Sequence, residues 1–322
     1  MDPAPQPRDL TWFRLLALSA VWLAATRLLP RYAIYLIPLS LARHMTLQAY
    51  LMLVQVVVTA IGLGLAALIL RAPRRGLGLA WPAGYQLAIV IAATPIIFVA
   101  ASYIAIGAAF RTLMEEIARG GAEVSRQNAG EFGRSLKQDP AVLTVVWSAI
   151  LAPIAEELLF RGALWSFVTD LTRRLLRAPD KASESLSAFL DESPVVRALS
   201  TVKDWLLSGG IATVLSAGLF GWMHADMPGG VGIVRVVSTT CLGLACGVAR
   251  HRTGTVLAAI VVHFTFNALS IGQTRRWWIV GGFSNYFGVS TLMSLVAGLC
   301  AIGITIGVVV RYLITPRGKP AP

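Results

Sequence analysis

Residues 84–110 read GYQLAIVIAATPIIFVAASYIAIGAAF and contain no charged side chain. About 20 apolar residues in a helix are enough to cross the hydrocarbon core of a membrane, so this run is long enough to span it. The rest of the chain has a similar character. Over 322 residues the hydrophobic fraction is 56% and the charged fraction only 14%, against about 25% in soluble domains. The composition excludes an ordinary water-soluble enzyme and predicts an all-α, polytopic membrane protein.

Further apolar runs of comparable length follow one another along the whole chain and predict about eight transmembrane helices in a single membrane domain over residues 1–322. The eight predicted spans are residues 10–29, 46–70, 84–110, 140–168, 208–224, 230–249, 255–271 and 287–314.

Two hydrophilic segments, residues 111–139 and 170–204, interrupt the apolar pattern. Both predict amphipathic helices that lie near the membrane surface. Glu115 and Glu116 in the first segment stand among Arg, Gly and Gln residues. They are expected on a solvated helix face.

The net charge of +12 comes from Lys and Arg residues that stand mainly between the apolar runs. Nucleic-acid binding would need them on one exposed polar face, so this distribution indicates topology and contact with membrane lipid, and argues against a nucleic-acid partner. With eight spans, 16 of these residues fall on the side of both termini and 10 on the other. The bias predicts cytoplasmic termini, and the Ala, Arg and Gly richness favours a bacterial inner membrane. Cys241, Cys246 and Cys300 are an odd number in apolar stretches and are expected to be inert packing residues.

The fourth span contains the sequence WSAILAPIAEELLFRG at residues 147–162, with three ionisable side chains at membrane depth. Each costs about 2.5–3.5 kcal/mol there unless it is paired or hydrated. Glu157 and Arg161 are four residues apart, the spacing of a helical ion pair. Glu156 lies about 100° around the helix and lacks that partner, which makes it a candidate general base. Pro153 should kink the helix and free a backbone carbonyl. The alternative is one buried ion cluster that only fixes helix packing.

Two other spans also carry polar side chains. His224 lies near the end of the fifth span, and His263 and Asn267 share one face of the seventh. A lone membrane histidine is more often a packing residue than a catalyst, but polar groups on three helices favour a shared functional interior. Asp226 is expected to pair with Arg235, and the alternative is that it orients His224.

These residues resemble the three motifs of the CPBP family of intramembrane proteases, which includes the CAAX prenyl endopeptidases of the Rce1 type and bacterial bacteriocin-processing relatives. The family's E-E-x-x-x-R is similar to Glu156–Arg161, its F-x-x-x-H to Phe220–His224, and its H-x-x-x-N/D to His263–Asn267. The order, spacing and span placement agree over residues 140–271, the expected catalytic core.

The resemblance implies helices that enclose an intramembrane cavity in which a peptide bond is hydrolysed. Glu156, assisted by His224, would activate water, while His263 and Asn267 would form an oxyanion hole. Glu157, Arg161 and Phe220 would support the site. No metal is favoured, because a local H-E-x-x-H motif is missing. The alternative cofactor is Zn²⁺, held by Glu156, His224 and His263.

The leading hypothesis is an intramembrane endopeptidase that cuts near the C-terminal tail or another membrane-proximal segment of a membrane-anchored or lipidated protein or peptide. One alternative is a catalytically idle scaffold or immunity protein of the same fold. Another is a proton-coupled transporter, although the sequence lacks the repeated halves with broken helices that are frequent in transporters.

Overall fold

The computed structural model describes residues 11–38, 40, 45, 47–70, 73–120, 140–176, 205 and 209–275, and these contain helices and no strand. The elements are α1 (Thr11–Tyr32), η1 (Ala33–Leu36), α3 (Leu47–Ile69), α4 (Pro73–Leu77), α5 (Gly84–Gly120), α7 (Ala141–Thr144), η2 (Val145–Leu151), α8 (Ala152–Glu157), η3 (Leu158–Leu164), α9 (Trp165–Leu176), α12 (Ile211–Trp222), α13 (Gly229–Thr253) and α14 (Val256–Thr274).

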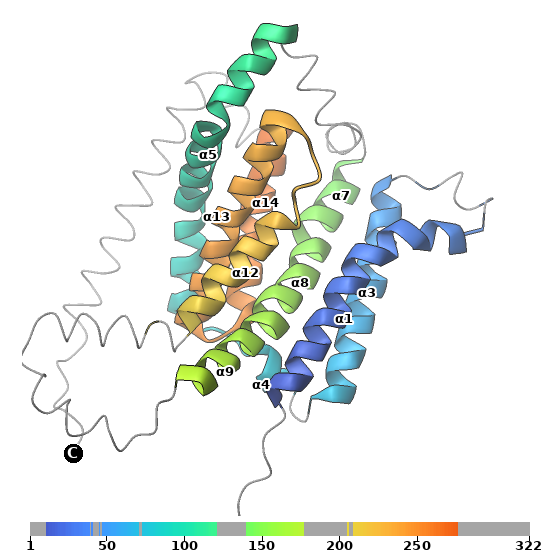
Figure 1. Cartoon of the computed structure of the whole chain (residues 1–322), viewed down its shortest axis with the longest axis vertical. Coiled ribbons are helices and arrows are strands. Elements are labelled where there is room, and N and C mark those ends of the chain that lie inside the picture. Colours follow the sequence, from blue (N-terminus) through green and yellow to red (C-terminus); the bar gives the residue numbers. More distant parts are fainter. Residues whose placement is uncertain are drawn as a thin grey trace, which may run out of the picture.

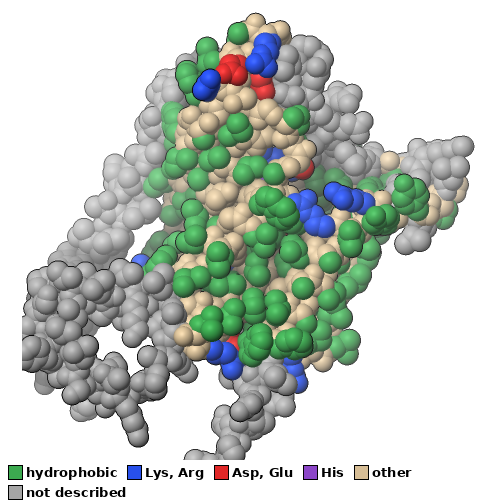
Figure 2. Space-filling view, viewed as in Figure 1, with side chains coloured by type: hydrophobic (Ala, Val, Ile, Leu, Met, Phe, Trp, Pro, Cys, Tyr) green, Lys and Arg blue, Asp and Glu red, His purple; other side chains and the backbone are tan. Residues whose placement is uncertain are grey.

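Within the described residues, six helical stretches are long and apolar enough to cross a membrane: Trp12–Tyr32, Ala49–Ile69, Gly84–Gly120, Ala141–Leu175, Gly229–Thr253 and Val256–Thr274. Helices satisfy their backbone hydrogen bonds internally, which the hydrocarbon core requires. Many large apolar side chains on them are exposed, for example Phe13, Ile104 and Phe110, as a lipid-facing surface demands. Figure 2 shows apolar side chains over most of the visible body, with charged groups near its ends and part-way along one side. The all-α, polytopic membrane fold is thereby confirmed.

The count of eight spans is not confirmed, and the predicted fifth span is described only in part, because residues 206–208 lie outside the described residues. Helix α12 has only 12 residues, about 18 Å at 1.5 Å per residue, which is too short to cross a hydrocarbon core of about 30 Å. Within the described residues the helix ends at Trp222, and the turn that follows carries His224. The predicted eighth span, residues 287–314, and Cys300 lie outside the described residues.

The central feature of the fold is one helical stretch that runs through α7, η2, α8, η3 and α9 (Figure 1). Helices α12, α13 and α14 pack on one side of it, and α13 and α14 also pack against α5. Helices α1 and α3 pack against each other and contact the central stretch on its other side in the view of Figure 1. Pro153 and both glutamates therefore lie between the two groups of helices.

The central stretch is α-helical at α8 and π-helical on either side, in η2 and η3. In η2 the N–H of Ala152 bonds to the carbonyl of Trp147, five residues earlier. The next residue, Pro153, has no N–H to continue this pattern. Such π-helical insertions are frequent at functional sites, and here they flank Glu156 and Glu157.

The expectation of a solvated face at Glu115 and Glu116 is half wrong. Helix α5 continues through both residues to Gly120. Glu115 forms an exposed pair with Arg111, but Glu116 is buried and accepts a hydrogen bond of 2.9 Å from the N–H of Gly230. A carboxylate is stabilised at the amino end of a helix by the unpaired N–H groups and the helix dipole. Glu116 thus fastens the end of α5 to the start of α13.

Candidate functional site

Glu157 is the most enclosed carboxylate of the central stretch, with no solvent-exposed side-chain surface. Nη1 of Arg161 donates to its Oε1 at 3.0 Å, as the four-residue spacing predicts. Nη2 of the same guanidinium donates to the carbonyl of Gly243 on α13 at 2.7 Å. Arg161 therefore neutralises Glu157 and also ties the central stretch to α13.

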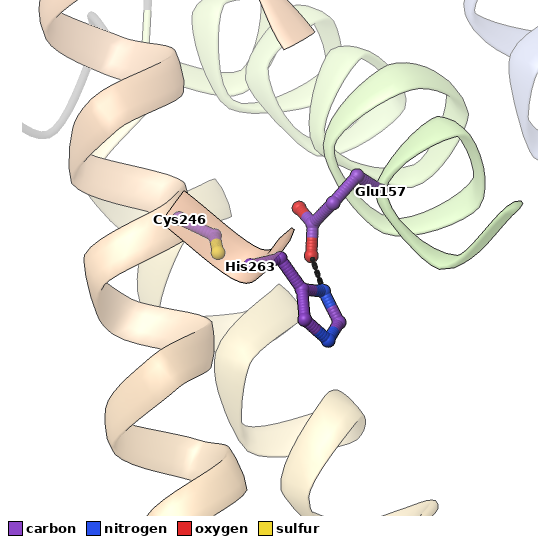
Figure 3. Close-up of side chains that lie close together, drawn as sticks. All are labelled: Glu157, Cys246 and His263. Atoms are coloured by element: carbon purple, nitrogen blue, oxygen red, sulfur yellow. Dashed lines mark hydrogen bonds and ion pairs between the residues drawn. The ribbon is translucent and has the colours of Figure 1, made fainter. Parts of the chain in front are cut away.

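His263 reaches both glutamates from α14. Its Nδ1 lies 2.8 Å from Oε1 of Glu157, which accepts the proton of that nitrogen (Figure 3). Its Nε2 faces Oε2 of Glu156 at 3.7 Å, which is longer than a direct hydrogen bond and leaves room for a bridging water. The Glu156 side chain is 21% exposed, whereas that of Glu157 is fully buried. Glu156 is thus the carboxylate that a substrate and water can approach.

His224 lies in the turn after α12. Its Nδ1 is 2.8 Å from the carbonyl of Phe220, and because a carbonyl only accepts, Nδ1 carries the proton and Nε2 of the neutral ring is left with a lone pair. Burial lowers the pKa of His224, and the Glu156 carboxylate opposes this shift. The histidine is held in the tautomer that can accept a proton.

The Phe220 ring packs edge-on against both histidines, with centroid distances of 4.7 Å to His224 and 5.5 Å to His263. The guanidinium of Arg161 lies over the same ring at 4.9 Å, a cation–π arrangement. Phe220 therefore spaces the two imidazoles with its ring and orients His224 with its carbonyl.

Asn267 is positioned by the irregular backbone of the central stretch. Its Nδ2 donates to the carbonyl of Ser148 in η2 at 2.7 Å. In a π-helical register this carbonyl would be matched by the N–H of residue 153, which is proline. The carbonyl that Pro153 was expected to free is thus the one that holds Asn267. The second N–H of the Asn267 amide is left for another acceptor.

The structure therefore brings Glu156, Glu157, His224 and His263 together around Phe220 and fixes Asn267 one turn along α14. The predicted pair of Asp226 and Arg235 is confirmed at 3.2 Å. Sequence reasoning missed the contact between Glu157 and His263, because Arg161 already supplied a partner for Glu157. A pocket of about 380 Å³ lies beside the turn after α12, and none of the candidate catalytic residues lines it.

The residues expected to bind zinc are not the ones whose ligand-type atoms gather most closely. Among the residues that the structure describes, the ligand-type atoms that gather within 4.8 Å of one another belong to Glu157, Cys246 and His263 (Figure 3), not to the set expected from the motifs. Arg161 and His263 both bond to Oε1 of Glu157. A metal ion would lie beside a buried guanidinium and would have to displace these bonds. Cys246 packs near the glutamate with its thiol donating to the carbonyl of Ala259 at 3.5 Å.

The sequence and structure were compared with known protein families, curated proteins and solved structures. No curated protein and no solved structure matches the chain. Residues 138–269 match the sequence model of the family described as Rce1-like, type II CAAX prenyl endopeptidase. All three motifs lie inside that segment, so the resemblance to the CPBP and CAAX proteases is confirmed. Over residues 138–269, about two fifths of the chain, the sequence is thus similar to the Rce1-like family of type II CAAX prenyl endopeptidases.

Proposed function

We propose that this integral membrane protein is an intramembrane endopeptidase that hydrolyses a peptide bond near the membrane-proximal or C-terminal tail of a membrane-associated protein. The observation that carries the proposal is the partly exposed Glu156 opposite Nε2 of His263, in a site where the carbonyl and ring of Phe220 contact His224. The family match supports a protease of the CAAX type.

In the proposed reaction, Glu156 and His224 take a proton from water as its oxygen attacks the carbonyl carbon of the scissile bond. The carbonyl oxygen becomes negatively charged and accepts hydrogen bonds from Nδ2 of Asn267 and from His263. Because Nδ1 of His263 donates to Glu157, donation from its Nε2 requires the imidazolium form. The proton then passes to the leaving nitrogen as the C–N bond breaks, which releases a carboxylic acid and an amine.

Glu157 and Arg161 support the site without touching the substrate. Their ion pair holds Nδ1 of His263 from one side, and that fixes the ring with Nε2 toward Glu156. The proposal uses no metal, and it places the protein in a bacterial inner membrane with both termini in the cytoplasm.

The test is cleavage of a membrane-anchored peptide library by the detergent-purified protein, with and without a chelator. Wild type should cleave equally in both conditions. Glu156→Ala should lose a factor of about 10²–10⁴ in rate, while its melting temperature stays close to wild type. Asn267→Ala should lose about 10²–10³ in kcat. Full cleavage by Glu156→Ala would contradict the mechanism, inhibition by chelator would restore the metal alternative, and wild type without activity would favour an idle scaffold.

A further inference from the structure

Arg27 reaches the turn that carries His224 from α1, a helix outside the segment that matches the family. Its Nη2 donates to the backbone carbonyl of Met223 at 2.8 Å. The guanidinium also lies over the Trp222 ring, 5.6 Å from the centroid. Arg27 thus contacts the two residues that directly precede His224.

The Met223 carbonyl is at the carboxyl end of α12, where helices leave their last carbonyls without a partner inside the helix. The N–H groups of Met223 and His224 are bonded back to Leu219 and Gly221, both at 2.9 Å. Arg27 supplies a donor to the free end of this helix, and a cation is the favoured charge there.

A second arginine holds the other half of the turn. Nε of Arg235 on α13 lies 3.2 Å from Oδ1 of Asp226. The turn is therefore bonded on the side of Met223 to α1 and on the side of Asp226 to α13, with His224 between the two attachments. A rotation of the turn would move the His224 ring relative to Glu156.

The position of Arg27 argues that this contact is more than general packing. It lies in a membrane-spanning helix that also carries Arg14 and Arg31, but Arg31 is exposed whereas Arg27 is partly buried, and a partly buried arginine in a span needs partners for its donors. Its partner here is a backbone group next to a candidate catalytic histidine, and α1 also packs along η3, the segment of Arg161. Helix α1 thus contacts both the turn that carries His224 and the segment η3 that carries Arg161.

We propose that Arg27 is a positioning residue of the active site, which sets the orientation of His224 by holding the carbonyl of Met223; this inference rests on the proposed protease function. The rest of the machinery is carried by residues 138–269, so the site is completed by a helix from outside the family segment. Loss of Arg27 should slow the chemical step and leave substrate binding nearly unchanged.

Arg27→Met removes every hydrogen-bond donor of the side chain. Arg27→Gln and Arg27→Lys each keep one donor group. The matched control is Arg31→Met, because Arg31 is exposed and lies one helical turn further along α1. We expect kcat of Arg27→Met to fall roughly ten-fold or more, with KM within two-fold of wild type. Arg27→Lys and Arg27→Gln should have a higher kcat than Arg27→Met, and Arg31→Met should have the kcat of wild type. Wild-type kcat in Arg27→Met, or an equal loss in Arg31→Met, would overturn the proposal.

A readout that does not need activity separates this inference from the proposed function. Diethyl pyrocarbonate modifies the unprotonated imidazole, and mass spectrometry can follow its rate at His224. The rate should change several-fold in Arg27→Met and stay at the wild-type value in Arg31→Met. If wild type cleaves no better than Glu156→Ala, the proposed function fails and the His224 rate alone decides on Arg27. An unchanged rate in a folded Arg27→Met protein would overturn the positioning role.

Discussion

Arg161 and Arg174 form ion pairs of the same spacing in two different environments. Arg161 and Glu157 have no exposed side-chain surface, whereas Arg174 and Asp170, at 3.0 Å, are 41% and 33% exposed. A buried pair gains little over an apolar pair, but removal of one partner leaves an uncompensated charge. An exposed pair contributes little in either case.

Arg161→Ala should therefore lower the free energy of unfolding by about 3–5 kcal/mol. The control Arg174→Ala should cost no more than about 0.5 kcal/mol. Thermal unfolding of both variants in the same detergent is the measurement. Equal melting temperatures would mean that Glu157 finds water or a proton when Arg161 is removed, and the assignment of the pair as structural support would be wrong.

At the level of single residues, sequence spacing predicts local partners and misses distant ones. Glu157 and Arg161 are four residues apart and their pair could be read from the sequence, whereas His263 is 106 residues from Glu157 and its contact could not. The prediction that Glu116 is solvated was wrong for the same reason. Its neighbours in sequence are polar, and its partner is the N–H of Gly230 at the start of another helix.

At the level of elements, Pro153 leaves the Ser148 carbonyl of the central stretch without a backbone N–H partner, and Asn267 bonds to it. A Pro153→Ala variant regains an N–H that can bond to the Ser148 carbonyl and so compete with Asn267. We expect kcat to fall roughly ten-fold or more, because a displaced oxyanion donor is costly. The melting temperature should be unchanged or higher, because alanine is the better helix former.

The control for Pro153→Ala is Pro95→Ala, since Pro95 also lies inside a long helix, α5. Steady-state kinetics and thermal unfolding of both variants check the prediction. An unchanged kcat in Pro153→Ala would show that Asn267 keeps its place without the free carbonyl. The missing N–H at Pro153 is predictable from the sequence, but the π-helical register that selects the Ser148 carbonyl is not, because no side-chain pattern encodes it.

The contact between α12 and α13 is close enough to require glycine at one of two neighbouring positions. A Cβ at Gly221 would lie 1.8 Å from Oγ1 of Thr240 and 3.1 Å from the carbonyl of Val236, whereas a Cβ at Gly218 would meet nothing within 4 Å. Small residues allow such close approach between membrane helices.

Gly221→Ala should cost about 1–3 kcal/mol of stability through overpacking. Gly218→Ala, three residues away on the same helix, should be neutral or stabilising by up to about 1 kcal/mol. Thermal unfolding in detergent compares the two. A Gly221→Ala protein as stable as wild type would mean that α12 and α13 can separate without loss, which a second close approach does not favour, since a Cβ at Gly243 on α13 would lie 3.0 Å from the Cα of Ala217 on α12.

For the whole molecule, composition was enough to predict the fold class, because a membrane leaves few alternatives to apolar helices. The arrangement of the helices was not predictable, since lipid-facing and protein-facing sides are both apolar. The orientation of the protein in the membrane can be tested at two exposed residues, Arg74 in α4 and Glu115 near the end of α5. About 31 residues of helix, or roughly 46 Å, separate the start of α5 from Glu115.

Because that distance exceeds the hydrocarbon core of about 30 Å, the two positions should lie on opposite sides of the membrane. The excess of Lys and Arg on the side of the termini predicts that Arg74 lies in the cytoplasm and Glu115 outside it. Single cysteines at these positions, in a background with Cys241, Cys246 and Cys300 replaced by Ala, can be labelled in intact cells with a membrane-impermeant maleimide. We expect at least five-fold more labelling at residue 115 than at 74, and the ratio should approach one after the membrane is permeabilised. The reverse ratio would invert the topology and place the termini outside, and equal labelling in intact cells would mean that α5 does not cross the membrane.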